Sequence, residues 1–72
     1  MSMGFTDVKR EVTAMKEAQE RTLRETGRAF HQNRVICGYS VNLHSDGEYM
    51  VGCAMVRTTD PETVARFIWE RI

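Results

Sequence analysis

The sequence predicts a single α+β domain with the order α-β-β-α, in which an antiparallel β-hairpin lies between a long N-terminal amphipathic helix and a short C-terminal helix, completed by homodimerisation. Two patterns lead to this fold class. Apolar residues alternate with period two on both sides of Asp46-Gly47, and they follow helical spacing before and after that hairpin. The expected segments of the domain, residues 1–72, are a loose tail, two helices and two strands: tail 1–5, helix 7–31, strand 34–44, strand 48–57 and helix 61–71.

The composition is that of an ordinary globular protein, with 42% hydrophobic and 28% charged residues. Ten basic side chains balance ten acidic ones, so no overall charge draws the chain to nucleic acid or to an anionic membrane. No apolar run has the length of a membrane span or of a signal-peptide core. With two cysteines only, the chain is expected in a reducing compartment, and we predict a cytoplasmic protein.

The first helix is predicted from a stripe of small and apolar side chains. On a helix these side chains fall within one arc of about 140°: Val8, Val12, Met15, Ala18, Thr22, Leu23, Ala29 and Phe30. Thr6 is the expected N-cap, and Asp7 follows in the first turn, where a negative charge favours the helix dipole. Gly27 costs about 1 kcal/mol relative to Ala inside a helix, and the alternative is that the helix ends there.

The hairpin is predicted from Asp46-Gly47, a dipeptide suited to the positive φ angles of a two-residue type I′ turn. This turn places His44 opposite Tyr49 and Val41 opposite Gly52. One face then holds apolar and small side chains that a helix is expected to cover: Val35, Cys37, Tyr39, Val41, Leu43, Met50, Gly52, Ala54 and Val56. The second face is half apolar: Ile36, Gly38, Ser40, Asn42, His44, Tyr49, Val51, Cys53 and Met55.

The last helix begins at a cap followed by proline, Asp60-Pro61, and its buried stripe is Val64, Phe67, Ile68 and Ile72. A two-stranded hairpin is only about 10 Å wide, because strands are spaced about 4.8 Å apart. Two helices side by side need about 20 Å. Either the helices cover opposite faces, or two chains pair edge to edge into a four-stranded sheet. The homodimer is favoured, since neither strand carries the Lys or Pro that blocks edge pairing.

No motif for catalysis, for a cofactor or for a metal stands out, and the chain is expected not to be an enzyme. In the predicted register Cys37 and Cys53 project from opposite faces, so no disulfide between them is expected. The spacing of His31, Cys37, His44 and Cys53 matches no zinc pattern. The two cysteines are therefore interpreted as small buried hydrophobes.

The expected function is that of a regulator or inhibitor that binds a partner protein, of the kind that phages and other mobile elements encode. The predicted partner-binding surface combines the half-apolar hairpin face with the tryptophan of the last helix: Ile36, Tyr49, Val51, Met55 and Trp69. The alternative is a nucleic-acid-binding module that uses the basic end of the first helix: Arg21, Arg24, Arg28 and Arg34. The simpler interpretation of these arginines is a solvated face that pairs locally with Glu17, Glu20 and Glu25.

Overall fold

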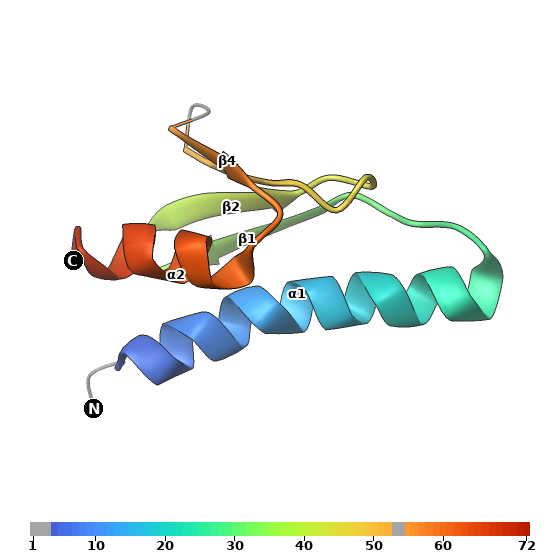
Figure 1. Ribbon diagram of the computed structural model, residues 1–72, viewed down its shortest axis with the longest axis horizontal. Helices are drawn as coiled ribbons and strands as arrows, with labels where there is room; N and C mark the ends of the chain where they lie inside the picture. The colour runs from blue at the N-terminus through green and yellow to red at the C-terminus, as the bar shows by residue number, and fades with distance from the viewer. Residues whose placement is uncertain (1–3, 53–54) are drawn as a thin grey trace.

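The computed structural model describes residues 4–52 and 55–72, and these form two helices and a four-stranded antiparallel sheet (Figure 1). The elements in chain order are α1 (Phe5–Thr26), β1 (Gln32–Ile36), β2 (Tyr39–Leu43), β3 (Tyr49–Val51), β4 (Val56–Thr58) and α2 (Pro61–Trp69). The predicted α+β class is confirmed. Across the described residues, neither helix is both long and apolar enough to cross a membrane.

The sheet is a simple meander in which each strand pairs with the next one along the chain, in the order β1-β2-β3-β4. Both helices lie on the same side of the sheet, so the molecule has two layers with the core between them (Figure 1). Both helices and three of the strands contribute buried side chains to that core: Val8, Val12, Met15, Ile36, Val41, Leu43, Tyr49, Val51, Val64, Ala65 and Ile68.

Helix α1 starts earlier and ends earlier than the predicted helix 7–31. Gly4 is its N-cap, and the Gly4 N–H donates a hydrogen bond of 3.0 Å to the Asp7 carboxylate. At the other end, Gly27 has φ 76° and its N–H donates to the Leu23 carbonyl oxygen at 2.8 Å. Only glycine enters this left-handed region at little cost, so the alternative of an end at Gly27 is confirmed.

The predicted single strand 34–44 is wrong, because Cys37-Gly38 forms a tight turn in its middle. Cys37 has φ 51° and Gly38 has φ 83°, as both central residues of a type I′ turn require. Ile36 therefore lies opposite Tyr39, and the predicted strand folds back on itself as the hairpin β1-β2.

The predicted single strand 48–57 is also divided. Strand β3 ends at Val51, and Gly52 follows with φ 62°. The Met55 N–H then donates to the Val51 carbonyl oxygen at 3.0 Å, and β4 begins at Val56 opposite Val51. Cys53 and Ala54, which the predicted hairpin faces also included, lie outside the described residues.

The turn at Asp46-Gly47 is confirmed, but the predicted register is wrong by one residue. The Gly47 N–H donates to the His44 carbonyl oxygen at 2.9 Å, and Gly47 has φ 92°, which is the geometry of a three-residue loop with a bulge at glycine. Val41 consequently lies opposite Val51. A shift of one residue exchanges the two faces of a strand, so Tyr49 and Val51 turn toward the helices.

Because both predicted strands are divided in two, a single chain forms a sheet wide enough to pack against two helices. Four strands at about 4.8 Å spacing make a sheet about 19 Å wide, which matches two helices side by side. The mismatch in width therefore no longer supports a homodimer. In the described part of the chain, the edge strands of the sheet are β1 and β4.

Candidate protein-binding surfaces

The five residues predicted to bind a partner do not form one exposed surface. Ile36, Tyr49 and Val51 are at most 3% exposed and belong to the core, because the register turns them toward the helices. Met55 and Trp69 are exposed, at 63% and 41%. The five residues therefore do not form the predicted surface. The two exposed ones lie apart in the chain, Met55 in the turn before β4 and Trp69 at the end of α2.

Tyr49 has a structural role in the core. Its hydroxyl donates a hydrogen bond of 2.6 Å to the Val12 carbonyl oxygen, which connects β3 to the middle of α1. Burial raises the pKa of Tyr49 to about 12, because the phenolate would lose its hydration. The side chain is therefore neutral and fixed at physiological pH.

Trp69 lines a shallow pocket where the start of α1 meets the end of α2. The pocket has a volume of about 380 Å³ and is lined by Phe5, Arg66, Trp69 and Glu70. The N-terminal end of α1 and the C-terminal end of α2 lie at the same end of the molecule (Figure 1). The Phe5 and Trp69 rings meet edge to face, with centroids 6.3 Å apart and planes at 68°.

The charges around this pocket are held in place by ion pairs. The Arg66 guanidinium lies 6.0 Å from the centroid of the Phe5 ring and 3.3 Å from a Glu62 carboxylate oxygen. Glu62 also accepts a hydrogen bond of 3.0 Å from the Lys9 ammonium group. The Lys9 hydrogen bond and charge, followed by those of Arg66, lower the pKa of Glu62. Arg66 is thus oriented beside the aromatic pair with donors left for a ligand.

Sequence reasoning missed Phe5 and Arg66 as parts of this pocket. Phe5 was assigned to the loose tail, although its spacing of three from Val8 continues the apolar stripe of α1. Arg66 gave no signal of its own, because a charged residue on the exposed side of an amphipathic helix is ordinary.

The opposite flank of α2 carries a second aromatic pair that is already covered. Phe67 meets Tyr39 edge to face with centroids 6.1 Å apart, and the Arg71 guanidinium lies 3.7 Å from the Phe67 ring centroid. The cation occupies the face of this ring. The Trp69 flank is therefore the more accessible aromatic surface of α2.

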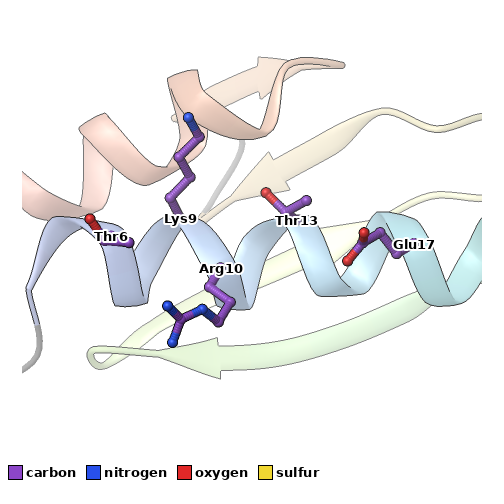
Figure 2. A pocket seen from close by; sticks show the side chains of 5 residues that line it. All are labelled: Thr6, Lys9, Arg10, Thr13 and Glu17. Atoms are coloured by element: carbon purple, nitrogen blue, oxygen red, sulfur yellow. The ribbon is translucent and has the colours of Figure 1, made fainter.

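A second depression lies along α1 alone, and Figure 2 shows the side chains that line it: Thr6, Lys9, Arg10, Thr13 and Glu17. Its two cations are both engaged, Lys9 with Glu62 at 3.0 Å and Arg10 with Asp7 at 3.5 Å. All its lining residues come from one helix and none is aromatic, so it lacks the two aromatic walls of the Trp69 pocket.

The sheet face turned away from the helices is mainly polar. Its side chains, read from the register, are Asn33, Val35, Ser40, Asn42, Met50 and Arg57. The Asn33 amide donates to the Ser40 hydroxyl at 3.0 Å and to the Asn42 side-chain oxygen at 2.9 Å. Val35, on β1, is 67% exposed, the largest exposure among the large hydrophobic residues described.

The four arginines of the nucleic-acid alternative do not share one surface. Arg34 lies on the helix-facing side of β1 and pairs with Glu11 at 2.8 Å. Arg21, Arg24 and Arg28 are exposed near the end of α1, and within the described residues their side chains form no hydrogen bond or ion pair. The basic surface is thus smaller than the sequence predicted.

The residues considered for metal binding do not gather into a site. Among the side chains that the structure describes, no group of three or more His, Cys, Asp or Glu residues is arranged to hold a metal ion. Cys37 lies half-buried in the β1-β2 turn, and Cys53 lies outside the described residues. His31 and His44 meet edge to face with ring centroids 4.9 Å apart.

Comparisons of this chain with protein-family models, with curated proteins and with solved structures found no match. A functional hypothesis for the chain therefore rests on the chemistry and geometry of the surfaces described above.

Proposed function

We propose that the protein is a non-enzymatic module, a regulator or inhibitor, that binds a partner protein through the pocket at the end of α2. The observation that carries this proposal is Trp69, exposed at 41% and packed edge to face on Phe5 beside the Arg66 guanidinium. Tryptophan and arginine dominate the residues on which protein–protein affinity depends, and they act best in concave sites.

The pocket also indicates the chemistry of the partner. Its aromatic walls, Phe5 and Trp69, suit an apolar side chain, because burial of such a group removes apolar surface from water. Arg66 supplies donors for a carboxylate or a backbone carbonyl at the rim. We therefore expect the partner to insert an apolar side chain that has an acidic neighbour.

The test is capture of proteins from an extract of the source organism with three tagged forms of the chain. These are the unaltered protein, Trp69→Ala and the control Leu23→Ala, which removes another exposed apolar side chain, at 46% exposure, near the far end of α1. A specific partner is expected with the unaltered protein and with Leu23→Ala, and it is lost with Trp69→Ala. Equal recovery with all three forms would contradict the proposal.

We further propose that the protein acts in the cytoplasm as a homodimer. Support comes from the two edge strands, since neither Gln32–Ile36 nor Val56–Thr58 contains a lysine or a proline. Sedimentation equilibrium of the purified chain tests the dimer. A molecular mass of one chain at all concentrations would contradict it.

A further inference from the structure

Among residues 4–52 and 55–72, no strand pairs with the outer side of β1, so this edge of the sheet presents backbone groups in a regular array. In a hairpin with a two-residue turn, alternate residue pairs exchange hydrogen bonds, beginning with the pair that flanks the turn, here Ile36 and Tyr39. The Ser40 carbonyl oxygen accepts from Gly52 on the other side, at 3.0 Å, which confirms that Ser40 does not bond to β1. The N–H and C=O groups of Asn33 and Val35 therefore point out from the edge.

We propose that this edge pairs antiparallel with β1 of a second copy of the chain, around a two-fold axis at Val35. This inference rests on the proposed homodimer and assigns its interface. In a symmetric antiparallel pair the same surface meets itself, so the outward N–H of Val35 in each copy faces the outward C=O of Val35 in the other. Two four-stranded sheets thereby join into one sheet of eight strands.

The side chains of β1 select the register. A two-fold axis at Arg34 would set two arginines directly opposite each other, which destabilises a strand pair. An axis at Val35 instead sets the two valines opposite each other and Arg34 opposite Ile36 of the other copy. The pair of valines covers apolar surface that is 67% exposed in the single chain, and β-branched cross-strand pairs favour sheet formation.

The charges and the side-chain sizes near the β1 edge also allow a second copy of the chain to pair there. The chain has a formal net charge of zero, and with the axis at Val35 each Arg34 stays paired with Glu11 of its own copy at 2.8 Å instead of facing the other Arg34. Two copies therefore approach without strong repulsion. On α1, the residues one and two turns after Glu11 on the same flank are Ala14 and Ala18, whose small side chains leave space beneath the joined strands.

The opposite edge is the weaker candidate. Strand β4 has three residues, against five in β1, so it offers fewer outward groups. Pairing of β1 with β4 of another copy would be head to tail, which builds open filaments rather than a closed dimer. A closed dimer that uses the longer edge strand therefore requires β1 of one copy to pair with β1 of the other.

A single cysteine at position 35 tests the register. Val35→Cys is made in a background of Cys37→Asn and Cys53→Ser, since asparagine tolerates the positive φ of position 37. Mild oxidation is expected to give a covalent dimer. The control, Ser40→Cys in the same background, lies about three strand spacings, roughly 14 Å, from its counterpart and is not expected to cross-link, because a disulfide needs Cα atoms within about 7 Å. A dimer that cross-links at position 40 and not at 35 would overturn the proposed register.

A charge at position 35 tests the interface without oxidation. Val35→Lys sets two ammonium groups face to face, whereas Ser40→Lys places the same side chain on the same sheet face, with its counterpart roughly 14 Å away and beyond the Debye length of about 8 Å. Sedimentation is expected to show at least about a tenfold weaker dimer for Val35→Lys and an unchanged one for Ser40→Lys. Circular dichroism of both variants confirms that they fold.

The remaining outcomes separate this inference from the proposals on which it rests. If Val35→Lys forms a dimer as strongly as the wild type does, the β1 interface is wrong, whereas the proposed homodimer is not contradicted. A wild-type chain that is monomeric overturns both. If that monomer also loses a captured partner on Val35→Lys, the edge binds a foreign strand and not a second copy. Loss of the captured partner in the Trp69→Ala variant tests the pocket at the end of α2 and does not bear on the β1 interface.

Discussion

Replacement of Tyr49 by phenylalanine tests the corrected register of the sheet. In the register that the Asp46-Gly47 turn predicted, Tyr49 lies on the half-apolar face, whereas the structure buries it completely against α1. Its hydroxyl donates to the Val12 carbonyl oxygen at 2.6 Å, and burial raises the pKa of Tyr49 from 10.0 to about 12. Both features give the substitution a measurable effect on stability.

The size and sign of that effect follow from the shift in pKa. Between pH 10 and pH 12 the folded state keeps the phenolic proton of Tyr49 that the unfolded state has lost, so a rising pH favours unfolding. The stabilisation is complete below pH 10 and is lost on the way to pH 12, by about 1.4 kcal/mol per pH unit and about 3 kcal/mol in all. At neutral pH, Tyr49→Phe loses one hydrogen bond, which costs about 1 kcal/mol.

The assay is urea unfolding followed by circular dichroism, at about pH 7 and then in steps from about pH 9 to pH 11. The wild-type chain is expected to be more stable than Tyr49→Phe at neutral pH, and this advantage vanishes near pH 11. Tyr39→Phe is the matched control, since it removes the same hydroxyl from a half-buried ring on β2. An equal alkaline loss in Tyr49→Phe and the wild type would refute the burial of Tyr49.

Two further predictions concern α1. Gln19 is buried, and its amide donates to the carbonyl oxygens of Phe30 and His44 at 2.9 and 2.8 Å, so Gln19→Leu should lower the free energy of unfolding by about 2 kcal/mol. The exposed neighbour gives the control: Glu20→Leu should change stability by less than about 0.5 kcal/mol, and equal costs would contradict the role of Gln19. The basic segment at the end of α1, residues 21–28, is expected to bind neither DNA nor RNA in a gel-shift assay at low salt. A shift that disappears when its three arginines become alanine would restore the nucleic-acid hypothesis.

The helices were predictable from the sequence because each has a local signal. Asp60-Pro61 starts α2, as expected, with the Asp60 carboxylate accepting from the Glu62 N–H at 3.2 Å. The buried stripe of α1 follows helical spacing from Val8 to Met15. Such signals depend on neighbours within one or two turns of the helix, so the fold of the rest of the chain does not change them.

The two extra turns in the sheet were not predictable with the same ease. Alternation of apolar residues continues through Cys37-Gly38 without a break, and cysteine seldom takes a positive φ. The available signals were an isolated glycine inside the run and a predicted strand of 11 residues, when strands usually have about five or six. Both point to an interruption, and neither fixes its place.

The register error shows why the candidate site was misplaced. Asp-Gly suits both a two-residue loop and a three-residue loop with a glycine bulge, and the sequence around Asp46-Gly47 does not separate them. The choice shifts every residue of the following strand to the opposite face. Tyr49 and Val51 thus moved from a proposed surface into the core, while Trp69 kept its exposed position because its placement depended only on the helical period of α2.

The most direct test of the proposed function is the affinity of a captured partner for the wild-type chain and for Trp69→Ala. Isothermal titration with the purified partner should show at least about a 30-fold weaker complex for Trp69→Ala, the loss of about 2 kcal/mol that is typical of a central interface residue. Leu23→Ala should bind as the wild type does. If Trp69→Ala binds the partner as tightly as the wild type, the pocket at the end of α2 is not the binding site and the account is contradicted.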